Sequence, residues 1–256
     1  MKQVSCKIIS NMQIAPLIYR LELKGDTSAL QNPGQFVNIA IPGFSLRRPI
    51  SVCDWKDGQI TLIYKAVGNG TRALARYREG NLDLLCGLGN GFSLSRAKGH
   101  IPLLIGGGVG IPPLYALAKK FKEQKARPVI FLGFNTASEI FYQKEFQELS
   151  DIVLISTMDG SCGIAGTVVD ALQIWAGENR DASPYLYSCG PIPMMRALWT
   201  QADRFGWEGE FSLEERMGCG FGACMGCSLL TASGAKRICR EGPVFVKGDL
   251  LWNPEK

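Results

Sequence analysis

The sequence has little of what acid–base or nucleophilic catalysis normally requires. Among its 256 residues there is one histidine, His100, and we find neither a catalytic triad nor a carboxylate dyad. His100 directly precedes an apolar run, which favours a structural role. Chemistry carried by a bound cofactor would not need such groups, because hydride transfer between cofactors depends on their alignment.

Long basic runs and long apolar runs are also missing. No stretch of lysine and arginine exceeds two residues, so the net charge of +5 is too diffuse to indicate a nucleic acid or membrane partner. Residues 1–6 lack the apolar core of a signal peptide. The most apolar long uncharged stretch, 99–118, is interrupted by Gly106-Gly107-Gly108 and Pro112-Pro113 and is not a membrane span. We expect a cytoplasmic protein.

Nine cysteines are present, and five of them are scattered through the first 190 residues. Their odd number and wide spacing favour reduced thiols in a reducing compartment, most of them simple packing residues. These five are Cys6, Cys53, Cys86, Cys162 and Cys189.

The other four cysteines follow the pattern C-x4-C-x2-C-x11-C. This spacing is that of plant-type ferredoxins and predicts one [2Fe-2S] cluster, and the glycine-rich run at 217–227 would let the backbone turn and bring N–H groups to sulfur. A four-thiolate zinc site is the alternative, but zinc ribbons usually supply two C-x2-C knuckles and only one is present. The predicted ligands are Cys219, Cys224, Cys227 and Cys239.

The pattern of apolar residues along the chain changes near residue 98. Short apolar runs at 6–10, 18–23, 35–41, 60–66 and 82–85, with one helix at 71–77, predict an antiparallel β-barrel over 1–97. Strands at 101–105, 128–132, 152–156 and 185–188 then alternate with helices at 112–121, 139–149, 167–175 and 192–205. That rhythm predicts a doubly wound parallel α/β domain over 98–213, ending in a strand at 209–213. Residues 214–256 form the predicted cluster-binding subdomain.

The two larger parts are joined by residues 95–99, which are too few for independent movement. We expect the parts to pack together and share a crevice at the carboxyl ends of the parallel strands, where doubly wound folds bind nucleotides.

Two motifs in the barrel half suggest a flavin dinucleotide site. In Arg47-Arg48-Pro49-Ile50-Ser51, an arginine offers a charged fork for a pyrophosphate and the serine hydroxyl could reach a polar edge of a bound ring. Alone this segment could be an ordinary charged strand edge. The run Ile63-Tyr64-Lys65 and the following helix start at Gly70-Thr71, where free N–H groups favour phosphate, strengthen the prediction.

Two further segments suggest a nicotinamide site. The turn containing Gly107, Gly108 and Gly110 joins a strand to a helix and would let the backbone approach a ligand, although it is not the strict G-x-G-x-x-G motif. Cys189 and Gly190 end another strand and could border a flat ring, or form a simple buried cysteine turn. Residues 133–139 lack a basic side chain for a 2′-phosphate, which favours NAD over NADP, with Glu139 as a ribose acceptor.

In order, these motifs resemble the ferredoxin–NADP reductase superfamily, a flavin barrel followed by a nicotinamide domain. With the appended cysteine motif the chain is similar to the PyrK family, the electron-transfer subunits of class 1B dihydroorotate dehydrogenase. The resemblance covers nearly the whole chain. It implies that one FAD and one [2Fe-2S] cluster link NAD to an FMN-containing catalytic subunit, which oxidises dihydroorotate in pyrimidine biosynthesis within a heterotetramer of two of each chain.

The resemblance also implies site residues. The wider superfamily often has an aromatic residue at the position of Ile50, so stacking on the flavin by this side chain is excluded. The four cysteines of the C-terminal motif would bind the cluster. The FAD would be lined by Arg48, Pro49, Ile50, Ser51, Ile63, Tyr64, Lys65, Gly70 and Thr71.

No second flavin barrel and no poised base for dihydroorotate is present, so a partner chain is required. Phe221 and Met225 beside the cluster cysteines are the predicted docking surface, or they simply shield the cluster from water. Two rival functions stay open. One is a sister subunit, from an NADH-dependent ferredoxin:NADP reductase or a sulfide dehydrogenase, and the other is a non-catalytic, zinc-stabilised binding module.

Overall fold

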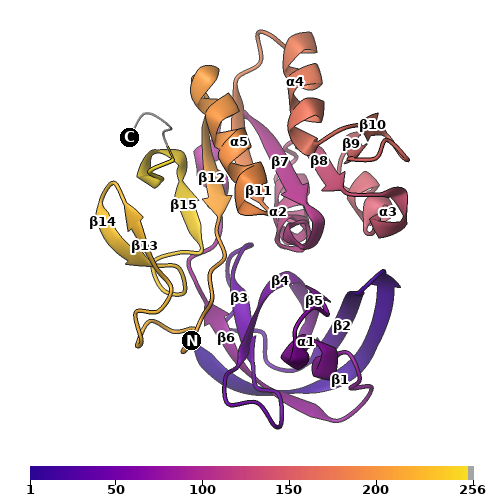
Figure 1. Cartoon of the computed structure of the whole chain (residues 1–256), viewed down its shortest axis with the longest axis vertical. Helices are drawn as coiled ribbons and strands as arrows, with labels where there is room; N and C mark the ends of the chain where they lie inside the picture. The colour runs from indigo at the N-terminus through magenta and orange to yellow at the C-terminus, as the bar shows by residue number, and fades with distance from the viewer. Residues whose placement is uncertain (253–256) are drawn as a thin grey trace.

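The computed structural model describes residues 1–252, and its first part is a closed antiparallel barrel (Figure 1). Side chains alternate between the barrel interior and its outside, as in β6, where every second residue is buried. The strands run in the order β1-β2-β5-β4-β3-β6. Their bounds are β1 Lys2–Ala15, β2 Ile18–Lys24, β3 Phe36–Ile39, β4 Arg48–Lys56, β5 Gln59–Lys65 and β6 Asn81–Leu88, with helix α1 at Asn69–Leu74.

The barrel confirms the predicted fold of the first part and adds one strand. The added strand, β4, begins at Arg48 and contains Pro49, in a segment where the sequence pattern predicted no strand. It pairs with both β3 and β5, and the ladder to β5 shifts register between Val52 and Asp54. Val52 points into the barrel core, and Cys53, the next residue, packs against the second part of the molecule.

The second part is a seven-stranded sheet ordered β10-β9-β8-β7-β11-β12-β15 (Figure 1). All neighbouring strands are parallel except β15, which runs antiparallel to β12 at the edge. The predicted doubly wound sheet is therefore confirmed. The strands are β7 Ile101–Gly107, β8 Val129–Phe134, β9 Ile152–Thr157, β10 Ile164–Ala165, β11 Pro184–Cys189, β12 Glu208–Ser212 and β15 Val244–Val246.

Helices cover both faces of this sheet. On one face, α2 (Pro112–Glu123) and α3 (Gln143–Gln147) share a core that also contains barrel residues Ile18 and Ile63. On the other face, α4 (Val168–Glu178) packs on β8 and β9, and α5 (Ile192–Arg204) packs on β11 and β12. The barrel thus packs directly on the α2 side of the sheet, and the strand β4 contacts α2.

The helix predicted over 139–149 is wrong in length. A short 3-10 turn at Ala137–Glu139 is separated from α3 by Tyr142, whose φ of 60° is left-handed. Phe141 is buried and Tyr142 is half-buried, so successive aromatic residues pack inward and interrupt the helical pattern.

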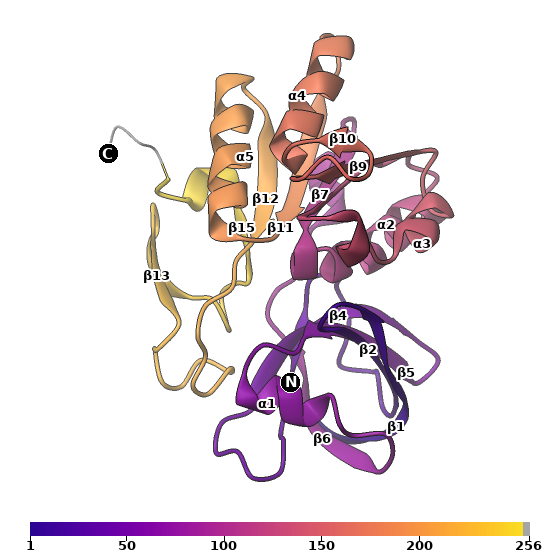
Figure 2. The ribbon, with the colours of Figure 1, turned by 45° about the vertical axis from the view of Figure 1, so that its right-hand side comes forward.

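The C-terminal segment leaves β12, forms a loop and a hairpin, and returns to the sheet as β15. The hairpin strands are β13 Ser228–Thr231 and β14 Gly234–Arg237. Figures 1 and 2 show the segment lying beside both larger parts of the molecule. The predicted cluster subdomain, 214–256, extends at 253–256 beyond the described residues. No helix within 1–252 has the length and apolarity needed to cross a membrane.

Candidate functional site

A cavity of about 400 Å³ lies between the barrel and the carboxyl ends of β7, β8 and β11. Residues from the barrel, from two strand-to-helix turns and from the segment after β12 line it. The predicted crevice between the two parts is therefore present. Of the predicted cofactor residues, the structure brings these to the cavity: Pro49, Ser51, Lys65, Gly107, Gly108, Gly110, Cys189 and Gly190.

The glycine-rich turn at the end of β7 lies very close to the residues that follow β11, which leaves little room for side chains. A Cβ atom on Gly110 would lie 2.4 Å from the carbonyl oxygen of Cys189, and one on Gly107 would lie 2.5 Å from Sδ of Met194. At Gly110 no larger residue fits without moving the backbone of the turn after β11, whereas at Gly107 the Met194 side chain could shift. The two turns therefore meet at the floor of the cavity, where they leave backbone groups open to a flat ligand.

Three predicted flavin residues have side chains outside the cavity. Ile50 and Tyr64 point into the barrel core, and the Tyr64 hydroxyl donates to Oδ1 of Asn11 at 3.0 Å. Ile63 is buried against the second part of the molecule. Because side chains alternate along a strand, the neighbours Pro49, Ser51 and Lys65 face the cavity instead. Only the backbone of the three buried residues could border a ligand there.

Arg48, Gly70 and Thr71 lie together at the start of α1, outside the cavity lining. A Cβ on Gly70 would lie 2.3 Å from Nε of Arg48, so this guanidinium rests directly on the first turn of the helix. Its Nη1 donates to the carbonyl of Leu46 at 2.5 Å. The Oγ1 of Thr71 and the backbone of Gly68 hydrogen bond to each other at 3.2 Å.

The side of the cavity formed by the second part of the molecule carries a carboxylate and a neutral thiol. Glu139 lines the cavity, and its Oε2 accepts a hydrogen bond from Nδ2 of Asn135 at 2.8 Å. Burial, reinforced by the charge of Glu214, raises the pKa of Cys189 to about 12, so the thiol is protonated at neutral pH. Among the described lining residues the only basic side chain is Lys65, from the barrel.

Sequence reasoning missed several lining residues. Phe36 begins β3 and reaches the cavity from the barrel, and Glu214, Glu215 and Met217 reach it from the segment between β12 and the cysteines. Met217 begins the glycine-rich run at 217–227, whereas the other three belong to no recognisable motif. Chain order places Glu214, Glu215 and Met217 next to the Cys219 loop, but it gives no such indication for Phe36. His100 is exposed, and its Nδ1 is 2.9 Å from Oγ of Ser183, away from the cavity lining.

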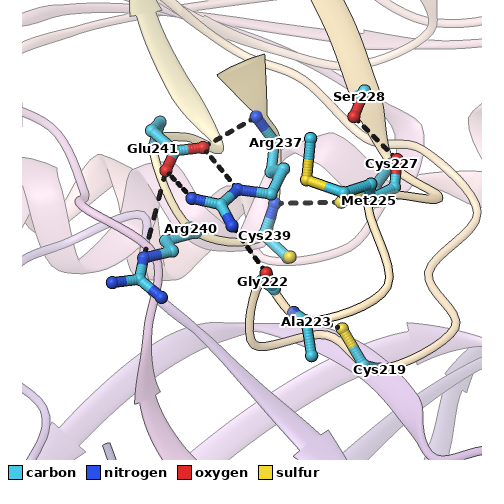
Figure 3. Close-up of polar contacts among 10 residues, drawn as sticks. All are labelled: Cys219, Gly222, Ala223, Met225, Cys227, Ser228, Arg237, Cys239, Arg240 and Glu241. Atoms are coloured by element: carbon cyan, nitrogen blue, oxygen red, sulfur yellow. Dashed lines mark hydrogen bonds and ion pairs between the residues drawn. The ribbon is translucent and has the colours of Figure 1, made fainter. Parts of the chain in front are cut away.

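The four cysteines of the C-terminal motif lie in the loop and on either side of the hairpin, as two pairs. Figure 3 shows Cys219, Cys227 and Cys239. Cys219 interacts with Cys224, and its Sγ accepts the N–H groups of Ala223 at 3.2 Å and of Cys224 at 3.4 Å. Cys227 interacts with Cys239, whose N–H donates to the Cys227 Sγ at 3.4 Å.

This arrangement fits a two-iron cluster. Within 1–252, no three cysteine, histidine, aspartate or glutamate side chains converge in a way that could hold a single metal ion. Two cysteine pairs suit two irons, and N–H groups directed at sulfur stabilise thiolates. Burial raises the pKa of the Cys219 thiol, but hydrogen bonds from the backbone N–H groups of Cys224, Phe221 and Ala223 outweigh it, so the pKa is lowered. All nine cysteines are free thiols.

An arginine joins the cluster loop to the hairpin (Figure 3). Arg237 Nη1 donates to the carbonyl of Gly222 at 2.6 Å, and the same guanidinium binds both carboxylate oxygens of Glu241, at 2.5 and 3.0 Å. Gly222 has a φ of 94°, which favours glycine. On the outside of the loop, Phe221 and Met225 are exposed.

Comparison with known proteins agrees with this geometry. Residues 214–251 match the family described as "Iron-sulfur cluster binding domain of dihydroorotate dehydrogenase B", and residues 104–199 match "Oxidoreductase NAD-binding domain". The electron transfer subunit of dihydroorotate dehydrogenase B (NAD+) from Fusobacterium nucleatum is 40% identical over 98% of this chain and 99% of its own. The corresponding subunit from Bacillus caldolyticus is 41% identical over 95% and 96%.

Solved structures show the same architecture. The NADH-dependent reduced ferredoxin–NADP oxidoreductase, a flavin-based electron-bifurcating enzyme, has a chain that superposes with a TM-score of 0.85, 31% identity and coverage of 97% of this chain and 90% of that chain. A ferredoxin NADP+ reductase from Neisseria gonorrhoeae has the same fold, with a TM-score of 0.68 and 16% identity over 80% and 92%. The chain belongs to the family of dihydroorotate dehydrogenase B (NAD+) electron transfer subunits, within the ferredoxin–NADP reductase fold.

Proposed function

We propose that this chain passes electrons between NAD and the FMN of a dihydroorotate dehydrogenase catalytic subunit, through FAD and a [2Fe-2S] cluster. One observation carries the proposal. The segment that follows β12 lines the cavity at Leu213, Glu214, Glu215 and Met217, and Cys219 follows two residues later. A cofactor bound in the cavity and a cluster bound by the cysteines would therefore be close neighbours.

The proposed division of labour follows the three parts of the chain. Residues 1–97 form the FAD-binding barrel, 98–213 the NAD-binding domain and 214–256 the cluster subdomain. Ser51 and Lys65, with Pro49, would face the isoalloxazine, while Arg48 beside Gly70 and Thr71 would serve the phosphates.

The nicotinamide would lie on the turns of Gly107, Gly108, Gly110 and Gly190. Glu139 would accept a hydrogen bond from a ribose hydroxyl. Among the described lining residues of this domain, none offers a positive charge to a 2′-phosphate, which supports NAD over NADP. The neutral Cys189 thiol would border the ring without adding charge. When bound, FAD accepts a hydride and releases its electrons singly, which is the chemistry that the protein side chains lack.

Cys219, Cys224, Cys227 and Cys239 are the proposed cluster ligands. The arrangement of their sulfurs in two pairs supports two iron atoms rather than one zinc. The zinc-stabilised module is therefore the weaker alternative, and the match of 214–251 to an iron–sulfur binding family also disfavours it.

The proposed partner is an FMN-containing catalytic subunit, in a cytoplasmic heterotetramer of two of each chain. Dihydroorotate would be oxidised on that subunit. Phe221, Met225 and Leu230 expose 41%, 53% and 67% of their surface on the cluster loop and hairpin, which supports docking at this face. Docking there would bring the partner's flavin toward the cluster.

Anaerobic addition of NADH to the purified chain, followed by low-temperature EPR, tests this proposal. We expect flavin bleaching and then a rhombic signal from a reduced two-iron cluster. Protein prepared with ample iron that contains no acid-labile sulfide would contradict it. A parallel titration with NADPH tests the cofactor preference, and a preference for NADPH would overturn the argument from missing charge.

A second candidate is the small subunit of an NADH-dependent ferredoxin–NADP reductase. The superposition over 97% of this chain at 31% identity supports it, although the identity is below the 40% found with the dihydroorotate dehydrogenase subunits. The partner distinguishes the two. Co-purification with an FMN-containing catalytic subunit supports the first function, and co-purification with a large second flavoprotein supports the other.

A further inference from the structure

The outward face of strand β3 connects the cavity to the cysteine loop. Val37 and Ile39 point into the barrel core, whereas Phe36 and Asn38 point outward. Phe36 lines the cavity and packs in the same apolar cluster as Cys227 and Cys239. Asn38, two residues along the same face, reaches the cysteine loop itself.

Asn38 is the polar contact in this packing. Only 1% of its surface is exposed, and its Nδ2 donates to the carbonyl oxygen of Cys219 at 3.1 Å, across 181 positions of sequence. The loop fits closely around the amide, because a Cβ on Gly220 would lie 2.3 Å from Nδ2. The loop that begins the cysteine motif is therefore fixed to the barrel by one buried side chain.

Burying the Asn38 amide carries a free-energy cost that its packing contacts alone would not offset. The Oδ1 of Asn38 is buried and has no hydrogen-bond partner within the described residues. A buried amide with one unsatisfied oxygen is less favourable than an apolar residue of the same shape. The backbone of Asn38 is also fixed, since Arg47 Nη1 donates to its carbonyl at 3.2 Å while Nη2 pairs with Asp83 at 2.6 Å.

The strand partner of Asn38 completes the connection. In the β3–β4 ladder Asn38 is opposite Pro49, which lines the cavity where the flavin is proposed to bind. Asn38 thus contacts the backbone of the first cysteine on one side and the wall of the cavity on the other. Because electron transfer rates fall steeply with distance, a fixed separation between the two redox groups would keep the transfer rate constant.

We propose that Asn38 is a positioning residue for electron transfer, which holds the Cys219 loop at a fixed separation from the flavin site. This inference rests on the proposed function, because it assumes a flavin in the cavity and a cluster on the cysteines. Asn38 would not bind either cofactor through its side chain. Its replacement should therefore slow transfer between the cofactors and leave hydride transfer from NADH unaffected.

The test is anaerobic rapid mixing of NADH with the full chain carrying its cofactors, following flavin bleaching and cluster reduction as separate phases. Asn38→Asp keeps the size but sets a carboxylate against the Cys219 carbonyl, and Asn38→Ala removes the contact without a buried charge. We expect unchanged flavin bleaching and several-fold slower cluster reduction in both, with full cluster content. If Asn38→Asp does not fold, Asn38→Ala decides.

Gln35→Glu is the matched control. Gln35 is a buried amide immediately before β3, and it bonds the barrel backbone at Gln31, Asn32 and Gly89 rather than the cysteine loop. The same change from amide to carboxylate there should leave the ratio of the two phases at the wild-type value.

Two results would overturn the inference. One is cluster reduction at the wild-type rate in Asn38→Ala, and the other is loss of the cluster from that variant, which would assign Asn38 to holding the ligands. Failure of the proposed function is distinguishable, because the unaltered chain would then lack one of the two phases.

Discussion

The ion pair that closes the cluster loop leads to a quantitative prediction. Arg237 bonds the Gly222 carbonyl and both oxygens of Glu241, and the two side chains are only 23% and 33% exposed. For a partly exposed, charge-assisted set of this kind we expect a contribution of about 2 kcal/mol to keeping the loop closed. Arg237→Gln should therefore raise the open population of the loop roughly 30-fold.

The assay is the rate at which an iron chelator removes metal from the anaerobically prepared chain. If the loop recloses faster than the chelator reacts, this rate follows the open population and should also rise roughly 30-fold. Arg240→Gln is the matched control. It removes the same charge beside the same glutamate, but Arg240 is 63% exposed and its Nε is 4.0 Å from Glu241, so its effect should stay within about twofold.

The pH dependence follows from the same pair. The hydrogen bond from Arg237 is the largest cause that lowers the pKa of Glu241, from 4.5 to about 2. A depressed carboxylate pKa gives stability that is fully present above 4.5 and is lost as the pH falls through 2, so the contribution is constant near neutral pH. Equal iron release from Arg237→Gln and Arg240→Gln would show that net charge, and not this contact, retains the loop.

Three further predictions concern the cavity and the sheet. Gly110→Ala should abolish measurable NADH binding in a fluorescence titration, because its Cβ would lie 2.4 Å from the Cys189 carbonyl, whereas Gly177→Ala, with open space around its Cβ, should bind normally. Glu139→Gln should raise the Kd for NADH roughly tenfold through a weaker ribose contact, and an unchanged Kd would remove Glu139 from the site. Burial raises the pKa of Glu210 from 4.5 to about 6, so stability that is present below pH 4.5 is lost as the pH rises through 6. Glu210→Gln should abolish this loss, which is about 2 kcal/mol. The prediction is refuted if urea unfolding of the variant across that pH range shows the same loss of stability as the wild type.

Local patterns were sufficient to predict the fold class. The βα rhythm after residue 101 and the short barrel strands depend on periodicity and turn residues within each segment, and both parts formed as expected. The cysteine spacing likewise predicted where the cysteine loop would lie, but not the hairpin of β13 and β14 that follows it. β15 was missed because its three residues, Val244–Val246, form a strand only by adding to the edge of β12.

Side-chain direction within the site was harder to predict. The segment from Arg48 to Ser51 was singled out from the sequence, and Pro49 and Ser51 from it line the cavity. Whether Ile50 or its neighbours face the cavity depends on the register of β4 against β3 and β5. That register includes a shift that no local pattern reveals. The same limitation applied to Tyr64, whose hydroxyl finds Asn11 inside the barrel.

The contacts that join the redox sites could not be read from sequence at all, because they link distant segments. Arg47 and Arg48 are adjacent in one motif, yet Arg47 holds β3 through Asn38 and Asp83, while Arg48 rests on Gly70. Neighbouring residues at the start of a strand face opposite ways, so only one arginine of such a pair can serve a phosphate. The other is then available to fix the strand that carries Asn38.

The C-terminal segment is consequently built into both larger parts. β15 pairs with β12, Asn38 binds the Cys219 carbonyl, and Nδ2 of Asn90 donates to the carbonyls of Glu241 and Val244 at 3.0 and 2.7 Å. A segment that begins on the sheet, touches the barrel at both ends of the cysteine motif and returns to the sheet cannot move independently of either. The separation of the proposed flavin and cluster is therefore set by the fold of the whole chain. Weakening any one of these contacts should change the rate of electron transfer between the cofactors more than it changes the affinity for NADH.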